Sequence, residues 1–240
     1  MRSFFPYIEE DLKKLADSEK ANILSRFFKT GKGEYGEGDR FFGIPVPEQR
    51  KIAIKYSGIS RDDICRLLSD KIHEYRLVAL LILILQYEKG NKDEKKKIAD
   101  FYLANTRHIN NWDLVDLSAP KILGNYLLDK DRAILYKLVA SDNLWAKRIA
   151  IMATFAFIRD NQFEDTFRIV KILLYEKHDL IQKAAGWMLR EIGKRNQRKE
   201  EEFLKKYSPE MPRTMLRYAV ERFDEQRKRL YIKQRRGCRS

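Results

Sequence analysis

An internal repeat constrains the fold of this chain more than any other feature of its sequence. Ser69-Asp70 precedes Arg76 and an apolar stretch, and Ser141-Asp142 precedes Arg148 with the same spacing, so the two segments are offset by 72 residues. Trp112 lies halfway between the two arginines. This spacing indicates a structural unit of about 36 residues that is used several times.

Apolar residues at helical spacing lie on both sides of each repeat position. These patterns predict helices over residues 12–29, 47–56, 92–106, 129–140 and 163–176, with a further copy of the repeat at 213–223. Paired helices that recur at about this period are typical of HEAT-like repeats. The sequence therefore predicts an all-α fold, an α-solenoid of HEAT-like helical repeats.

Two rows of residues occupy equivalent positions in successive repeats. The first row is Arg76, Trp112, Arg148 and Lys183, and the second, one helical turn later, is Leu80, Asp116, Met152 and Trp187. We expect both rows to lie on the same side of the stack. Cations and indoles in these rows predict a concave basic face that follows phosphates and stacks on a flat group.

The segment 181–194 separates its two faces most clearly. Its apolar stripe is Ile181, Ala185, Met188 and Ile192. A second stripe, rotated away from the first, is Lys183, Trp187, Arg190 and Lys194. Steps of three and four residues are those of a helix with one face in the core, so the basic stripe is expected at a surface that binds phosphates.

The charge of the chain favours a polyanionic partner. Lys and Arg outnumber Asp and Glu by 49 to 35, a net charge of +14, which makes nucleic acid the first expectation and an anionic membrane surface the second. Residues 190–240 hold 17 Lys and Arg against 8 Asp and Glu. We expect a single repeat domain over residues 1–226 and a basic C-terminal tail over residues 227–240.

The sequence shows no pattern for a membrane span, a signal peptide or a zinc site. The longest apolar run, residues 77–85, is about half of what a spanning helix needs, and Glu9, Glu10 and Asp11 stand where a signal peptide is apolar. The two cysteines, Cys65 and Cys238, lie far apart. We expect a cytoplasmic monomer that uses no metal and no cofactor and does not act at a membrane.

Residues 31–38 contain four of the eleven glycines. The Gly-Lys-Ser/Thr ending of a Walker A loop is absent, and no strand pattern precedes the segment. We therefore expect a flexible connection rather than a loop that cradles phosphates.

Residues 110–116, Asn-Asn-Trp-Asp-Leu-Val-Asp, have the pattern of a helix start, with Asn110 or Asn111 as the N-cap. Trp112 and Asp116 are four residues apart, so a helix places the indole and the carboxylate on one side. A carboxylate there needs a partner or solvent, and the pair suggests a site for a cation. Asp113 lies in the first turn, where the helix dipole favours an acid, and has a structural role.

Several of these residues also have a purely structural interpretation. A lone tryptophan on a helix usually belongs to the core, and only the register shared with basic residues favours a site for Trp112 and Trp187. Arg148 stands where helical repeats often keep a cation for hydrogen bonds between repeats. That alternative stays open beside phosphate binding, and it fits Arg76 and Lys183 equally well.

Other polar and aromatic residues carry no catalytic pattern. The histidines, His73, His108 and His178, have no partner at nucleophile, base or metal spacing, and we expect them at the surface or at helix caps. Trp145 fits either core or site. Any reaction that this chain catalyses must need very little acid or base.

Taken together, these motifs resemble the AlkD-like DNA alkylation repair proteins, a family of HEAT-like-repeat DNA glycosylases. The similarity covers nearly the whole chain, through Phe42-Gly43-Ile44 with Pro47-Glu48 and the segments 112–116, 141–148 and 181–191. The resemblance implies that the carboxylate, two tryptophans and arginine of the family's active cleft match Asp116, Trp112, Trp187 and Arg148. Where the family can carry a cleft tyrosine, this chain has Phe27.

The resemblance implies a monofunctional glycosylase that excises positively charged N3- and N7-alkylated purines, such as 3-methyladenine and 7-methylguanine, from alkylated double-stranded DNA without enclosing the base. Such bases leave without a general acid, and Asp116 would stabilise the oxocarbenium-like sugar and orient water. The expected DNA contacts are Arg148, Lys183, Arg190, Lys194, Arg76 and Phe27. The alternative is a non-catalytic HEAT-like solenoid that binds nucleic acid or protein.

Overall fold

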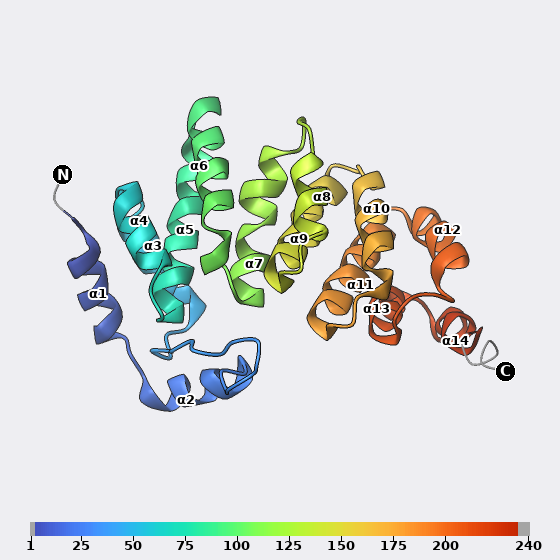
Figure 1. The fold of residues 1–240 in the computed structure, drawn as a ribbon, viewed down its shortest axis with the longest axis horizontal. Helices are drawn as coiled ribbons and strands as arrows, with labels where there is room; N and C mark the ends of the chain where they lie inside the picture. The colour runs from blue at the N-terminus through green and yellow to red at the C-terminus, as the bar shows by residue number, and fades with distance from the viewer. Residues whose placement is uncertain (1–2, 235–240) are drawn as a thin grey trace. The chain divides into compact units, whose positions relative to one another are not determined.

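The computed structural model describes residues 3–234, and the regular elements among them are all helical (Figure 1). An isolated parallel bridge between Arg40 and Ile72 is the one β contact in this part of the chain. The all-α prediction is thereby confirmed. The chain divides into two compact units, Met1–Ser118 and Ala119–Ser240. A solenoid with a concave basic face, and a single domain over residues 1–226, stay predictions.

The first unit is built around one apolar helix. Its elements are α1 (Phe5–Lys14), α2 (Ser18–Phe27), α3 (Val46–Lys55), α4 (Arg61–Leu68), α5 (His73–Lys89), α6 (Lys92–Ala104), the 3-10 turn η1 (Thr106–His108) and α7 (Trp112–Ser118). Residues 73–84 of α5 are buried on every side. Residues 77–84 are all apolar, as expected of a helix buried all round, and the charged side chains of its first turn have partners within the unit. The helices α3, α4, α6 and α7 pack against α5.

One helix predicted over residues 12–29 is in fact two, α1 and α2. Asp17 separates them: its N–H donates to the Phe42 carbonyl at 2.7 Å, and its carboxylate caps α2 by accepting from the N–H of Lys20 at 3.0 Å. Gly43 makes this approach possible, because a Cβ at that residue would collide with the Asp17 carbonyl oxygen, and its φ of 81° suits glycine. The break therefore depends on a contact with a distant loop.

Glu74 ties the same loop to α5. Its buried carboxylate accepts hydrogen bonds from the backbone N–H groups of Phe42, Gly43 and Ile44, at 3.0, 2.8 and 3.2 Å. The helix predicted over residues 47–56 follows as α3, with Pro47 in its first turn. The motif around Gly43 thus fixes where the N-terminal helices lie on the unit.

The second unit contains the remaining elements. They are the π-helical turn η2 (Pro120–Gly124), α8 (Ala133–Val139), α9 (Leu144–Arg159), α10 (Glu164–Ile172), η3 (Leu173–Tyr175), α11 (Asp179–Gly193), α12 (Gln197–Tyr207), α13 (Arg213–Ala219), η4 (Val220–Arg222) and α14 (Glu225–Gln234). The helix α11 packs against α9, α12 and α13 (Figure 1). Gly186 lets α11 and α13 touch, since a Cβ there would collide with the Met215 carbonyl oxygen.

Part of the expected basic tail, residues 227–240, is helical. Residues 227–234 belong to α14, whose Tyr231 is buried with its ring 5.8 Å from that of Phe223. Residues 235–240, including Cys238, lie outside the described residues. Among the helices that the structure describes, none combines the length and the apolar character needed to cross a bilayer.

Candidate functional site

The helix α7 carries an indole and a carboxylate one turn apart. Asn111 stands at the N-cap position, because its carbonyl accepts the first intrahelical hydrogen bond, from the N–H of Val115 at 3.1 Å. Its Oδ1 accepts from the N–H of the adjacent Trp112 at 2.8 Å. Leu114 and Val115 point into the core, whereas Trp112 and Asp116 are both half-buried. The indole is therefore not sealed in the interior, and both groups reach the surface of the unit.

Two phenylalanines at the end of α2 surround Trp112. Phe28 is buried and stacks on the indole, with ring centroids 5.2 Å apart and an interplanar angle of 22°. Phe27 meets the indole edge-on at 5.9 Å and is 60% exposed. The structure thus brings two of the predicted site residues, Phe27 and Trp112, into one aromatic cluster with an exposed π surface.

The repeat register predicted Arg76 on an exposed basic face, but the structure places this residue in the interior of the unit. Its side chain is only 4% exposed, its guanidinium lies 2.7 Å from the Asp39 carboxylate, and it donates a hydrogen bond to Asn110. Leu80, one turn later, is also buried. A buried guanidinium needs such partners, so the contacts observed for Arg76 are internal to the unit, and a contact with DNA stays a prediction.

His73 is buried, and the prediction that it lies at the surface or at a cap is wrong. Its Nε2 lies 2.7 Å from Asp113 Oδ2, and its Nδ1 lies 3.5 Å from Asp39 Oδ2, an ion-pair contact without hydrogen-bond geometry. Burial alone lowers the pKa of His73, but the Asp113 carboxylate and then Asp39 outweigh it and raise the pKa to about 9. The partners lie 40 and 34 residues away, so no local motif marks them.

The other two histidines are near helix ends. His178 caps α11, since its Nδ1 accepts from the N–H of Leu180 at 3.2 Å, which confirms the prediction of a cap. His108 closes the turn η1 and lies 3.0 Å from the Nε of Arg107. Neither contact resembles a catalytic base beside a nucleophile.

In the second unit, α11 has the two stripes that the sequence predicts. Ile181, Ala185, Met188 and Ile192 are fully buried. Trp187 is half-buried, its Nε1 donates to Glu191 Oε1 at 2.8 Å, and its ring lies 6.2 Å from that of Phe155. The same Glu191 oxygen pairs with Lys194 Nζ at 2.6 Å. Glu191 therefore orients both the indole and the ammonium group.

The other cations of the basic stripe have acidic partners too. Lys183 pairs with Asp179 at 2.7 Å, and Arg190 pairs with Glu221. Partly exposed pairs of this kind are worth at most about 1 kcal/mol. A phosphate can therefore compete for these cations at low cost.

The sequence left open a structural role for Arg148, a hydrogen bond between neighbouring helices, and the structure shows such a bond. Arg148 is 5% exposed and donates a hydrogen bond from α9 to the Leu180 carbonyl of α11. Met152 and Trp145 of the same helix are also buried, so Trp145 belongs to the core. A contact between Arg148 and a phosphate stays a prediction.

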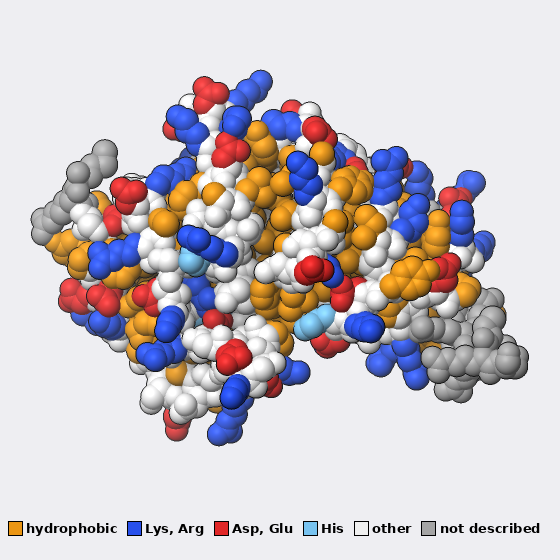
Figure 2. Space-filling model, viewed as in Figure 1, with side chains coloured by type: hydrophobic (Ala, Val, Ile, Leu, Met, Phe, Trp, Pro, Cys, Tyr) orange, Lys and Arg blue, Asp and Glu red, His pale blue; other side chains and the backbone are white. Residues whose placement is uncertain are grey.

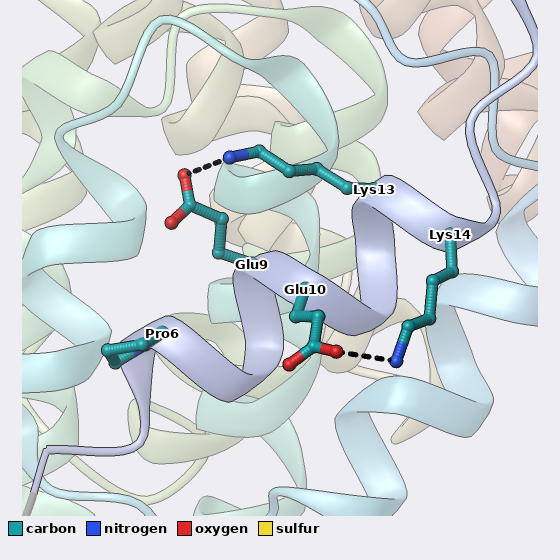
Figure 3. A pocket seen from close by; sticks show the side chains of 5 residues that line it. All are labelled: Pro6, Glu9, Glu10, Lys13 and Lys14. Atoms are coloured by element: carbon teal, nitrogen blue, oxygen red, sulfur yellow. Dashed lines mark ion pairs between the residues drawn. The ribbon is translucent and has the colours of Figure 1, made fainter.

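Two pockets of the described residues lie apart from these side chains. One follows α1 and is lined by Pro6, Glu9, Glu10, Lys13 and Lys14, with ion pairs between Glu9 and Lys13 and between Glu10 and Lys14 (Figure 3). The other is lined by Lys130, Asp131, Arg132, Ala133, Tyr136, Asp165 and Arg168. The first offers charge but no aromatic face, and neither contains the predicted site residues.

The surface carries both signs of charge. On the face drawn in Figure 2, Lys and Arg side chains lie among Asp and Glu and exposed apolar groups. Within the described residues, no group of three or more His, Cys, Asp or Glu side chains could hold a metal ion. In the glycine-rich segment, carboxylates bind backbone N–H groups of the same segment. Glu34 accepts from the N–H of Gly31 at 2.9 Å, and Glu37 accepts from the N–H of Gly33 at 2.8 Å.

Comparisons with known proteins agree with this architecture. The family model described as DNA alkylation repair enzyme matches residues 8–223. Among solved structures, the chain is similar to one described as a predicted DNA alkylation repair enzyme from Enterococcus faecalis, with 19% identity, 88% of this chain and 97% of that chain covered, and a TM-score of 0.68. At this identity the likeness shows a shared fold. No curated protein matches the chain.

Proposed function

This chain belongs to the DNA alkylation repair enzyme family, and we propose that it is a monofunctional DNA N-glycosylase of base excision repair. Its substrates are cationic N3- and N7-alkylated purines, such as 3-methyladenine and 7-methylguanine, in double-stranded DNA. The observation that carries this proposal is the pair on α7, a half-buried Trp112 with the Asp116 carboxylate one turn further on. We propose that the protein acts as a cytoplasmic monomer.

The chemistry suits a site without a general acid. Alkylation at N3 or N7 leaves the purine positively charged, so the C1′–N bond breaks with release of a neutral base. Positive charge then develops on the deoxyribose, and a preorganised carboxylate stabilises that charge more than it stabilises the ground state. Asp116 has this role, and it orients the water whose oxygen adds to C1′ while a proton passes to solvent.

The aromatic cluster supports the same transition state. The indole of Trp112 is held by its stack on Phe28, and the exposed ring of Phe27 lies beside it. A π face attracts a cation by about 0.5–1 kcal/mol at an exposed site. Trp112 and Phe27 therefore stabilise the cationic base and sugar, and the base is not enclosed in a pocket.

Basic residues of the second unit bind the DNA backbone. Three cations exchange their acidic partners for phosphates: Lys183, Arg190 and Lys194. This exchange costs little free energy, because the ion pairs are partly exposed. The roles proposed for Trp187 and Arg148 rest on their match to the family's cleft residues. The DNA contact proposed for Arg76 rests on the sequence repeat alone, since its observed partners are Asp39 and Asn110.

The net charge of +14 alone also favours a second candidate, a non-catalytic protein that binds nucleic acid. Chromatography of the bases freed from methylated duplex DNA separates the two. We expect 3-methyladenine and 7-methylguanine in the supernatant after incubation with the protein and no release from unmodified DNA. Salt-sensitive DNA binding without base release would select the non-catalytic protein instead.

A further inference from the structure

The start of α7 is held in place by side chains from elsewhere in the first unit. This helix has only seven residues, and helices this short are unstable without tertiary contacts. Asn110 accepts from Arg76, Asn111 donates to Asp39 at 3.3 Å, and Asp113 binds His73. The segment that carries Trp112 is thus tied on both sides of the indole.

His73 lies at the centre of these contacts, between two carboxylates. Asp39 approaches from the loop before Arg40, Asp113 from α7, and Arg76 from the next turn of α5. Glu74 turns away, to the backbone of residues 42–44. With an imidazolium at His73, two positive charges balance two negative ones in a buried cluster, whereas a neutral imidazole leaves one negative charge uncompensated.

The imidazole also contacts the aromatic cluster. It stacks on Phe41 at 4.7 Å, and the Phe28 ring lies 5.1 Å from it and 5.2 Å from the indole of Trp112. Phe28 therefore lies between the charged cluster and the indole. A change at His73 reaches α7 by two routes, through the Asp113 carboxylate and through the Phe28 ring.

We propose that His73, as an imidazolium between Asp39 and Asp113, is a positioning residue that fixes the first turn of α7 and with it Trp112 and Asp116. The effect on catalysis rests on the function proposed above, while the effect on α7 does not. Because the pKa of His73 is raised from 6.5 to about 9, its contribution is complete below about pH 6.5 and is lost as the pH rises through 9.

A titration of the whole protein by nuclear magnetic resonance tests the positioning without any substrate. We expect the His73 ring nitrogens to titrate near pH 9, and the amide of Leu114, which donates to Asp113 Oδ1 at 2.8 Å, to shift with the same midpoint together with the Trp112 indole N–H. In Asp113→Asn the histidine midpoint should fall by about one unit or more. A midpoint at or below about 6.5, or an unmoved Leu114 amide, would overturn the proposal.

Single-turnover base release tests the catalytic consequence. We expect His73→Gln to slow release at pH 7.5 by at least about 10-fold while DNA affinity is kept, because small displacements of reacting groups are costly. The matched control is Ile98→Val, which trims a buried α6 side chain outside the cluster and should stay within about 2-fold. A folded His73→Gln as fast as this control would contradict the proposal, whereas a wild-type protein that frees no base contradicts the glycosylase function instead.

Discussion

At the residue scale, some contacts of the site join residues that are close together in the sequence, and others join residues that are far apart in it. The start of α7 after Asn111 and the spacing of Trp112 and Asp116 are local features, so the sequence predicted the spacing and narrowed the N-cap to Asn110 or Asn111. The cluster around His73 is not local, since its Asp113 and Asp39 partners come from separate segments. None of the partners of His73 is close to it in the sequence, and the prediction therefore placed this histidine wrongly at the surface.

Phe27 offers a test at a single exposed ring. We expect Phe27→Ala to slow base release by about 2- to 5-fold, the loss of one exposed cation–π contact, and to change the unfolding free energy by less than about 1 kcal/mol, because the ring is 60% exposed. Single-turnover kinetics and thermal unfolding measure the two effects.

Ile23→Ala is the matched control for Phe27, since Ile23, one turn earlier on α2, is 65% exposed against 60% for Phe27. It should leave both quantities unchanged. Phe27→Tyr keeps the ring, adds the hydroxyl of the tyrosine that the family can carry, and should release base at least as fast as the wild type. Equal rates for Phe27→Ala and Ile23→Ala would remove Phe27 from the site.

At the element scale, caps and glycines decided where the helices begin and end. The helix predicted over residues 92–106 is found as α6, which begins at Lys92 because Asn91 and Glu94 form a complete capping box, each accepting from the other's backbone N–H. The prediction of a single helix over residues 12–29 was wrong, because the break at Asp17 depends on Phe42 and Gly43, which no local pattern reveals.

The capping box predicts the cost of removing it. We expect Asn91→Ala to lower the unfolding free energy by about 1 kcal/mol, because the N–H groups of Asp93 and Glu94 lose their acceptor. Urea unfolding measures this change. Lys97→Ala, at an exposed interior position of α6, should have almost no effect, and an equal loss in the two variants would contradict the assignment of the cap.

Glu200 of α12 predicts a pH dependence of stability. Burial, with a smaller contribution from Glu201, raises its pKa to about 8, and Arg190 opposes this only in part. The folded state therefore holds a proton that the unfolded state releases, so this contribution to stability is complete below about pH 4.5 and is lost as the pH rises through 8.

Glu200→Gln keeps the shape of the side chain and removes its charge. We expect it to leave stability unchanged at pH 5 and to raise the unfolding free energy at pH 9 by on the order of 1 kcal/mol or more. Denaturation curves at the two pH values measure this difference. A variant less stable than the wild type at pH 9 would show that the buried group is ionised and paired.

At the scale of the whole molecule, the period of the sequence predicted the helical class. Arg76 on α5 and Arg148 on α9, which share a place in the sequence repeat, are both buried, at 4% and 5% exposure. The period could not show which way they point, because their partners, Asp39 and the Leu180 carbonyl, come from other segments. Charge in a repeat register is therefore a weaker guide to a binding face than apolar periodicity is to a core.

The excess of positive charge predicts salt-sensitive binding to DNA. With about four phosphate contacts, affinity for a duplex should fall by about 100-fold between 50 and 200 mM salt. Lys183→Gln and Lys194→Gln should each reduce the slope of log affinity against log salt by about 1. Fluorescence anisotropy with a labelled duplex measures the slope.

Lys130→Gln is the matched control for these two lysines, because Lys130 is also partly exposed and paired with an acid, Asp129 at 2.7 Å. Its slope should equal that of the wild type. If the slope of log affinity against log salt decreased equally in all three variants, the basic stripe on α11 would have no special part in binding.

The central claim is that the Asp116 carboxylate stabilises the electron-poor sugar. The most direct measurement is the single-turnover release of 7-methylguanine from a duplex by the wild type, Asp116→Asn and Asp100→Asn, an exposed α6 control that pairs with Lys96. We expect Asp116→Asn to lose at least about 100-fold in rate with its DNA affinity kept, and Asp100→Asn to match the wild type. Release by Asp116→Asn at the wild-type rate would contradict the account.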